Sequence, residues 1–441
     1  MTRGQLEQKE YPTMKQETME GKDWIVDVHE KLARMDQKEE EEELWKKHSI
    51  YKVPKCFADI KSYAYKPRVV SLGPYHHGEP ELKQMEDHKQ RALLHLLRRT
   101  NKRVEDYTEA LKQVLPQLMD TYEGLDDKWR DEKRFLQLMV MDGCFMLEIL
   151  LTNEGVSNNY ASNDPIFSNH GKLHNMPYIR RDMLMIENQI PLLVLEKLVE
   201  VDEKNPKISI NKLILKFCNA STSTFNVGPG LHVLDIVRKS MLEGPKPPSP
   251  TQNEQSAGDI IRSATELQEA GIRFKKSKTQ SLRDIKFKHG VLSLPGIIVD
   301  DTTESTLLNL MAYERLHVGA GSEVTSYVFF MDNIIDSARD VSLLHSKGII
   351  QNAMGSDKAV AKLFNELSKD VTLDPESSLD KVHTLVHDYC KKSWNEWRAN
   401  LIHTYFRSPW AFLSLLAALF LLLLTVAQTV YTILSYHHPM G

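Results

Sequence analysis

Apolar residues recur at intervals of three and four along most of the chain. Between Met85 and Leu97, for example, Ala92, Leu93 and Leu96 form a stripe flanked by basic residues. This spacing predicts amphipathic α-helices, because it places the apolar side chains on one face. Further helices are predicted at 104–121, 133–151, 182–201, 208–217, 307–315, 324–336, 337–346, 358–367 and, as one long helix, 381–405.

Short β-like runs bounded by turn residues are confined to one part of the chain. They are Ile272–Phe274, Ile285–Phe287, Gly290–Leu294 and Gly296–Val299. One further short strand is expected at Val69–Leu72, in a segment rich in Pro, Tyr and Gly. The sequence therefore predicts a mainly α fold with a small β element: a large globular domain followed by a long helix and one C-terminal transmembrane helix.

The most apolar segment lies near the C-terminus. Trp410 to Leu434 contains no charged residue, and Gln428 is its only strongly polar one. As a helix with about 1.5 Å rise per residue it is roughly 37 Å long, enough to cross a hydrocarbon core of ~30 Å. Ser408 and Pro409 suit the start of such a helix, since Ser is a favoured cap and Pro a favoured first residue. We therefore expect residues 409–435 to lie in a lipid bilayer.

Basic residues flank this segment on one side only. Lys391, Lys392, Arg398 and Arg407 precede it, and SYHHPMG after it carries no Lys or Arg. The positive-inside rule predicts a cytosolic bulk with a short tail across the membrane. This is a single-pass, tail-anchored arrangement, and the receiving membrane, plasma membrane or endoplasmic reticulum, stays open.

Composition shifts divide the chain. The first residues are charged, with an acidic run at Glu39–Glu43 after a short amphipathic helix, and they carry no apolar signal sequence. The predicted parts are a charged, partly disordered extension (1–49), a helical N-terminal part (50–242), a Pro-rich linker or insertion (243–257), a C-terminal part with the β element (258–407), the transmembrane helix (408–436) and a short tail (437–441).

Composition also narrows the function classes. The chain has 441 residues, 41% of them hydrophobic and 26% charged, which fits a globular protein with a sizeable core. A formal charge of −4 gives no overall attraction to nucleic acid. The four cysteines are far apart, with no CxxC, and are expected to be free thiols in a reducing compartment.

Several segments, in order and at similar intervals, carry a resemblance to a known family. They are Ile50–Pro54, Ala64–Pro67, Val70–Gly78, Met85–Lys89, Met141–Phe145, Asp182 with Glu187–Pro191, Ser263–Phe274, Pro295, Asn309–Glu314, Pro409-Trp410 and Gln428-Thr429. Over residues 50–435 the chain resembles the plant domain-of-unknown-function 247 proteins. The resemblance implies a single-pass plant membrane protein without established catalytic residues, and a role in recognition or signalling, since some members are implicated in grass self-incompatibility. Some descriptions of that family place the soluble part outside the cell, opposite to the orientation that the flanking charges predict.

The residues that could form a catalytic or metal site are few. His76 and His77, with His88 and His95 on the next predicted helix, are the most suggestive set. Adjacent histidines point in different directions, and the other two are seven residues apart, so hydrogen-bonded histidines in a turn are favoured over a metal site. Glu187 and its polar neighbours before Pro191 are expected to satisfy backbone groups rather than act as a general acid or base.

Other chemistry has less support. Cys144 lies in an apolar helical stripe and is expected to be a buried thiol. There is no GxSxG, no phosphate-binding loop and no GxGxxG after a strand. The basic clusters 98–103 and 273–278 could touch anionic lipid, although solvated faces are favoured. No catalytic, cofactor-binding or metal residue is predicted, and no cofactor.

Within the predicted span, Thr425, Gln428, Thr429 and Thr432 form one polar stripe. Polar groups in lipid favour hydrogen bonds between helices, so this stripe is expected to support a homo- or hetero-oligomer. The favoured function is a membrane-anchored, non-enzymatic interaction or recognition protein with an unknown protein partner. The alternatives are a membrane-anchored enzyme with a site near His76, His77 and Glu187, and a purely structural tether.

Overall fold

The computed structural model describes residues 46–59, 61–156, 159–202, 209–220, 228–244, 262–369, 379–401 and 409–437, together with Trp24 and His29. The chain divides into two units, Met1–Lys47 and His48–Gly441, and nearly all described residues belong to the second. Apart from Trp24 and His29, the predicted amphipathic helix before residue 39 lies outside the described residues, as do most of the predicted linker 243–257 and the tail beyond His437. The predicted domain boundaries stay predictions.

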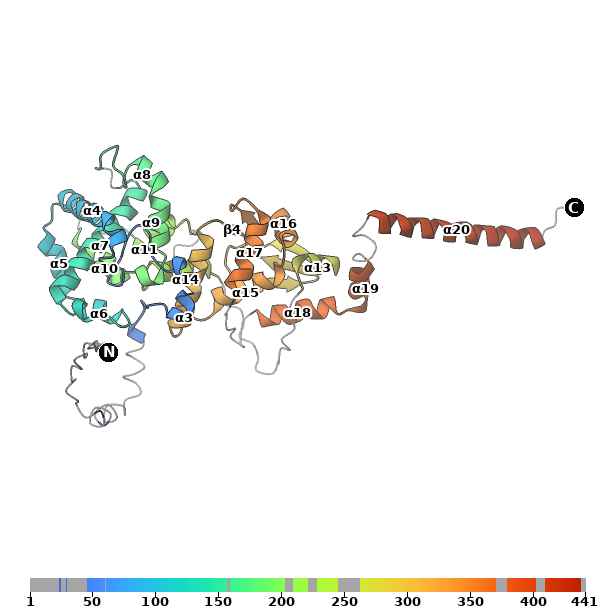
Figure 1. The fold of residues 1–441 in the computed structure, drawn as a ribbon, viewed down its shortest axis with the longest axis horizontal. Coiled ribbons are helices and arrows are strands. Elements are labelled where there is room, and N and C mark those ends of the chain that lie inside the picture. The colour runs from blue at the N-terminus through green and yellow to red at the C-terminus, as the bar shows by residue number, and fades with distance from the viewer. Residues whose placement is uncertain are drawn as a thin grey trace, which may run out of the picture. The chain divides into compact units, whose positions relative to one another are not determined.

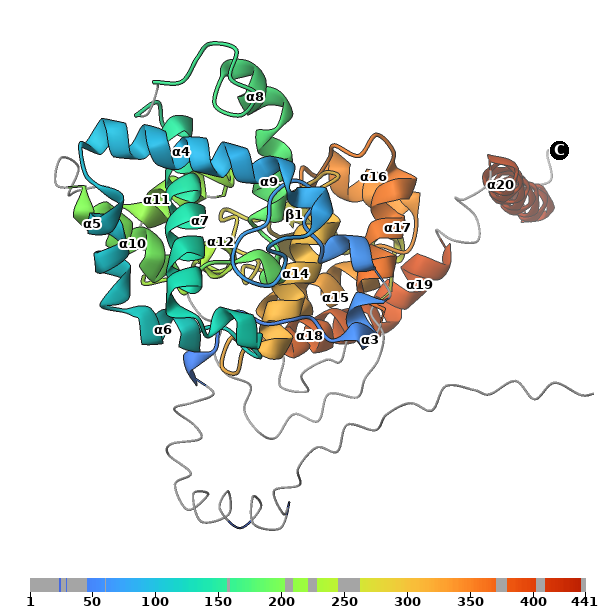
Figure 2. The same cartoon turned by 60° about the vertical axis from the view of Figure 1, so that its left-hand side comes forward.

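The first half of the second unit is built from helices around one central element (Figures 1 and 2). That element is α7, Glu132–Asn153, which contacts α4, α5, α10 and α11. Asp131 begins α7, because its side chain accepts hydrogen bonds from the Lys133 and Arg134 amides. The helices of this half are α3 Lys55–Ala58, α4 Gln84–Thr100, α5 Val104–Lys112, α6 Leu115–Asp120, α7, α8 Asn169–His174, α9 Met176–Asp182, α10 Leu192–Val201, α11 Ile210–Phe217 and α12 Val233–Met241, with 3-10 turns η1 Ser62–Ala64, η2 Pro80–Leu82, η3 Asp127–Trp129 and η4 Ile186–Asn188.

The second half holds all the strands that the structure describes, in two small sheets. In one, β1 runs parallel to β3, and β2 pairs with β3 antiparallel. In the other, β4 runs parallel to β5. The elements here are α13 Ala264–Glu269, β1 Arg273–Lys276, β2 Lys286–Lys288, β3 Val291–Leu294, β4 Ile297–Val299, α14 Thr303–Leu316, α15 Glu323–Ile334, α16 Ala338–Ser346, β5 Ile350–Asn352, α17 Asp357–Leu367, α18 Asp380–Cys390, α19 Ser393–Leu401 and α20 Pro409–His437. The mainly α fold with a small β element is confirmed.

Three predicted elements differ from the structure. No strand forms at 69–72, because the amides there donate to side chains instead of to a second strand. Of the helix predicted at 182–201, only the part after Pro191 forms, as α10. The residues before Pro191 form the 3-10 turn η4 instead, because proline does not continue a helix. The long helix predicted at 381–405 is divided into α18 and α19, where the Asn395 side chain donates to the Tyr389 carbonyl that the break exposes.

Pro116 divides another prediction, 104–121, into α5 and α6. Its ring cannot continue a helix, but it fits the first turn of the next one. β5, only three residues long, was not predicted.

Two described helices are long and apolar enough to cross a membrane. One is α7, of whose apolar window 89% is buried inside the fold. The other is the Leu413–Leu434 part of α20, of which 0% is buried. The predicted C-terminal helix is therefore confirmed as a helix, from Pro409 to His437.

Candidate functional site

The loop from Arg68 to Gly73 is held by carboxylate and amide side chains from two other segments. Asp182 accepts hydrogen bonds from the amides of Arg68, Val69 and Val70, at 3.0, 2.7 and 3.1 Å. Asn188 accepts from the Leu72 amide at 2.6 Å and donates to the Val70 carbonyl at 3.0 Å. These bonds replace the strand pairing that this extended segment lacks, as buried backbone groups require.

The same loop rests on a buried ion pair between α4 and α7. The ammonium of Lys89 lies 2.7 Å from a carboxylate oxygen of Asp142 and 2.7 Å from one of Glu86. The other Asp142 oxygen accepts the Gly73 amide at 2.8 Å. Burial alone lowers the pKa of Lys89, but the two carboxylates outweigh burial and raise this pKa, so the ammonium stays charged.

Gly73 occupies the tightest point of this loop. Its φ of 73° favours glycine, and an added Cβ would lie 2.6 Å from the carbonyl oxygen of Gln189. We call the set of Asp142, Lys89, Asp182, Asn188 and Gly73 the loop clamp.

The structure brings together two of the predicted site residues, His76 and Glu187. His76 Nε2 lies 3.1 Å from Glu187, and its Nδ1 contacts Glu79 at 2.7 Å. Burial lowers the pKa of His76, but the Glu187 and Glu79 carboxylates outweigh burial and raise this pKa, which favours the imidazolium. The second Glu187 oxygen accepts the Val53 amide at 2.6 Å.

The other predicted histidines lie elsewhere. His77 packs edge-on against Trp129, with ring centroids 5.4 Å apart, and burial lowers its pKa. His95 stacks on Tyr160 at 4.1 Å. His88 lies on α4, and burial lowers its pKa. The three-histidine metal arrangement is not formed, and no group of three metal-binding side chains occurs among the residues that the structure describes.

Gln189 and Cys144 take structural positions. The Gln189 amide donates to the carbonyls of Met183 and Met185, each at 2.7 Å, and its oxygen accepts the Leu234 amide. Cys144 is fully buried, and burial raises the pKa of its thiol, which keeps it protonated and unreactive. Both observations agree with the satisfied-backbone and buried-thiol interpretations.

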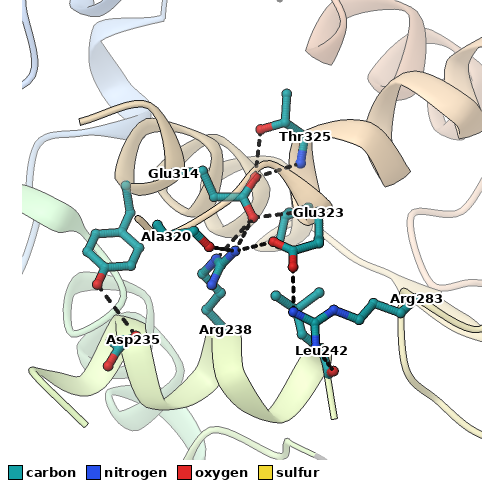
Figure 3. Close-up of polar contacts among 10 residues, drawn as sticks. Asp235, Arg238, Leu242, Arg283, Glu314, Ala320, Glu323 and Thr325 are labelled. Carbon is teal, nitrogen blue, oxygen red and sulfur yellow. Dashed lines mark hydrogen bonds and ion pairs between the residues drawn. The ribbon is translucent and has the colours of Figure 1, made fainter. Parts of the chain in front are cut away.

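A second polar network joins the two halves of the unit (Figure 3). Arg238 on α12 donates to Glu314 on α14 at 2.7 and 2.9 Å and to Glu323 on α15 at 2.8 Å. The Glu314 carboxylate also accepts the Val324 and Thr325 amides at 2.9 Å each, at the start of α15. A carboxylate there is favoured because the first amides of a helix have no partner within it.

Sequence reasoning did not identify this network or the Lys89–Asp142 pair. The available signal was a charged residue inside an apolar stripe, such as Asp142 between Met141 and Gly143. Such a charge requires a partner when buried, but the sequence does not say which residue supplies it.

Some residues of the basic clusters 98–103 and 273–278 form ion pairs or pack within the fold. Arg99 donates to Glu148 at 2.6 Å and to Asp202 at 3.4 Å, and is therefore tied to the core. Arg103 pairs with Asp106 at the surface. In the second cluster Phe274 is buried and its lysine neighbours are exposed. A lipid contact by either cluster stays a prediction.

The hydroxyls of the polar stripe in α20 bond within their own helix. Thr425 donates to the Leu421 carbonyl, Thr429 to that of Thr425 and Thr432 to that of Gln428, each at 2.8 Å. The side-chain amide of Gln428 makes no hydrogen bond to another residue that the structure describes, whereas its backbone carbonyl accepts from Thr432. Of the four stripe residues, Gln428 therefore has the most to gain from a neighbouring helix.

The elements that carry the loop clamp coincide with the segments on which the family resemblance rests. The family model DUF247, described as a plant protein of unknown function, matches residues 50–424. The chain belongs to the DUF247 family. This match includes both halves of the large unit, the loop clamp and the first part of α20.

Two relatives extend the DUF247 likeness over most of the chain. The UPF0481 protein At3g47200 of Arabidopsis thaliana is 32% identical over 416 residues, covering 88% of this chain and 86% of the relative. A second UPF0481 protein of that plant, At3g02645, is 25% identical over 510 residues, covering 92% of this chain and 93% of the relative. No solved structure matches the chain.

The polar side chains of the DUF247 segments mainly hold backbone and one another. Asp182, Asn188 and Asp142 each bond to loop amides, and Glu187 bonds to a backbone amide and contacts a histidine. An enzymatic site needs groups aimed at a substrate position. The contacts that these residues make give the enzyme hypothesis no support.

Proposed function

We propose that this DUF247 protein is a membrane-anchored, non-enzymatic interaction protein. The proposal has two parts: α20 crosses a bilayer, and the large unit is presented at its surface to an unidentified protein partner. The family resemblance extends the proposal to recognition or signalling, including plant reproduction.

The exposed apolar surface of α20 is the observation that most supports its role as a membrane anchor. Phe420, Leu421 and Leu422 are each 62% exposed, and none of the apolar stretch Leu413–Leu434 is buried. Exposed apolar surface costs roughly 25 cal/mol per Å² in water, so a helix this long and bare favours lipid. Trp410 lies at one end and Tyr436 near the other, where interfacial aromatics are enriched.

The flanking charges support a cytosolic large unit. Lys391, Lys392, Arg398 and Arg407 stand on the N-terminal side, and no Lys or Arg follows α20.

A non-enzymatic role is supported by how the family-matching polar residues are used. The charges of the loop clamp are paired or hydrogen-bonded inside the fold. They stabilise one loop conformation, which is the property of a display scaffold.

Glycosylation mapping in microsomes tests the orientation. One acceptor sequon is added after Gly441 and, in a second variant, before Lys391. Asn219, an exposed residue in the native sequon Asn219-Ala220-Ser221, is an internal reporter for the large unit. We expect modification only after Gly441; modification before Lys391 or at Asn219 would place the large unit in the lumen and overturn the cytosolic part of the proposal.

A further inference from the structure

Helix α19, the last described helix before α20, carries two tryptophans on its surface. Trp394 is 71% exposed and Trp397 is 56% exposed. They are three residues apart on one face of the helix, and their ring centroids are 5.3 Å apart. Large exposed aromatic pairs are unusual on soluble proteins and mark interaction surfaces.

The rest of α19 is fixed to the large unit. It contacts α13 and α18, and Asn395 is buried while donating to the Tyr389 carbonyl at 2.8 Å. The Arg398 guanidinium lies against Gly271, where an added Cβ would be 2.7 Å from Arg398 Nη1. These contacts hold the helix in place, so the tryptophan pair is a fixed feature of the surface.

The surroundings of the pair are basic. From Lys391 to Leu401 the chain has three basic residues, Lys391, Lys392 and Arg398, and one acidic residue, Glu396. Tryptophan favours the boundary between headgroups and acyl chains, and lysine and arginine favour anionic headgroups. An aromatic face with basic flanks is the composition of helices that lie in a membrane interface.

The length of chain between α19 and α20 limits their separation. Seven residues, 402–408, connect Leu401 to Pro409. At roughly 3.6 Å per residue these two positions are at most about 29 Å apart. If α20 crosses a bilayer, α19 is therefore tethered close to its surface.

We propose that the Trp394–Trp397 face of α19 docks on the bilayer interface beside α20, with the basic residues around it contacting anionic lipid headgroups. The docked face would fix the orientation of the large unit on the membrane. This inference rests on the proposed anchor, because without α20 in the bilayer nothing brings α19 to lipid.

Tryptophan quenching by brominated lipids tests the docking. The full chain is reconstituted in phosphatidylcholine vesicles, with and without phosphatidylserine, containing lipids brominated near the headgroup end of the acyl chain. The test variant is Trp394→Phe with Trp397→Phe, and the matched control is Trp24→Phe, another exposed tryptophan.

We expect the lipid-quenched emission to fall roughly threefold in the test variant, because two of the three tryptophans near the membrane, with Trp410 remaining, are removed. The control should quench like the unchanged chain. Lys391→Gln with Lys392→Gln should reduce the extra quenching that phosphatidylserine produces.

Two results would overturn the docking. Equal lipid quenching in the unchanged chain and the double Trp variant would show that the pair does not reach lipid. Shielding of the pair from both brominated lipid and aqueous iodide would show that a protein, such as a second copy, covers it.

Alkaline extraction of the same vesicles separates the two proposals. A chain that resists extraction but shows no lipid quenching at α19 keeps its anchor and loses only the docked face. A chain that is extracted has no anchor, and both proposals are then wrong.

Discussion

Helices α7 and α20 pass the same test of length and apolarity and have opposite surroundings. Of the apolar window of α7, 89% is buried within the large unit, whereas 0% of the window of α20 is buried. Composition over a window of residues therefore does not distinguish a core helix from a membrane helix. The distinction lies in which polar residues interrupt the apolar run.

In α7 the interruptions are charges with partners on other helices. Asp142 pairs with Lys89, and Glu148 accepts from Arg99 and from the Tyr160 hydroxyl. In α20 the interruptions carry no charge: Thr425, Thr429 and Thr432 bond to their own helix, and Gln428 is the one strongly polar residue. A helix whose charges need partners on neighbouring helices belongs in a folded core, and one that carries no charge and bonds its hydroxyls to its own backbone is suited to lipid.

A charge in the middle of each helix should give the largest contrast. Phe145→Asp on α7 buries an unpaired carboxylate and removes packing worth about 3–5 kcal/mol, a large part of a total stability of about 5–15 kcal/mol. We expect loss of cooperative thermal unfolding in detergent.

The matched variant on α20, Phe420→Asp, should leave that unfolding transition unchanged. It should weaken membrane insertion by about 2.5–3.5 kcal/mol, measured as the fraction that resists alkaline extraction. The reverse pattern, with Phe145→Asp folded and Phe420→Asp unfolded, would refute the assignment of the two helices.

The buried ion pair of α7 gives the next largest effect. Lys89→Met leaves Asp142 buried without its cation and should destabilise the large unit by about 3–5 kcal/mol in chemical denaturation. Lys89→Met with Asp142→Leu should recover part of this loss, because both charges are gone.

Lys83→Met, at an exposed lysine before α4, serves as the control. A Lys89→Met protein as stable as the control would show that the pair does not support α7.

Close packing against α10 is a second feature that distinguishes α7 from α20. A Cβ at Gly143 would lie 2.6 Å from Leu198 Cδ1 and 2.7 Å from Val194 Cγ1. Gly143→Ala should cost about 1–2 kcal/mol in unfolding free energy, since overpacking exceeds the gain in helix propensity. Ala418→Leu, an enlargement on exposed α20, should leave that free energy unchanged; equal effects at both positions would contradict the contrast.

The smallest effect is expected at the polar stripe of α20. Interhelical hydrogen bonds in membranes average about 0.6 kcal/mol, so Gln428→Leu with Thr429→Val should weaken an oligomer only modestly. Analytical ultracentrifugation in detergent measures the shift, with Leu423→Val off the stripe as control. An unchanged oligomeric state would remove the support for association through this stripe.

Periodicity predicted the elements that repeat one pattern over a long stretch. The predicted bounds of α7, of β1–β4 and of α20 lie within a few residues of the observed ones. Their patterns follow directly from which face meets the core or which surface is apolar.

Elements decided by contacts with remote residues were missed. The strand expected at 69–72 is an extended loop because Asp182 and Asn188, more than 100 residues away, take its amides. β5 is three residues long and pairs with β4 about 50 residues earlier.

The candidate site was predicted in the same uneven way. His76 and Glu187 were named together and do touch, whereas His77 faces Trp129 instead. The contact between His76 and Glu187 depends on how the residues after α9 fold back beside the loop at 68–76, and the contact of His77 depends on where η3 places Trp129. Local sequence patterns encode neither.

The most direct test of whether α20 is the anchor and α7 a core helix is alkaline extraction of membranes. It compares cells that express the full chain with cells that express a variant lacking Trp410–Leu434. We predict that the full chain stays with the membranes and that the deletion variant is released with its unfolding transition intact. Release of the full chain would contradict the anchor, and a deletion variant that stays embedded would show that another helix, α7 first among them, enters the bilayer.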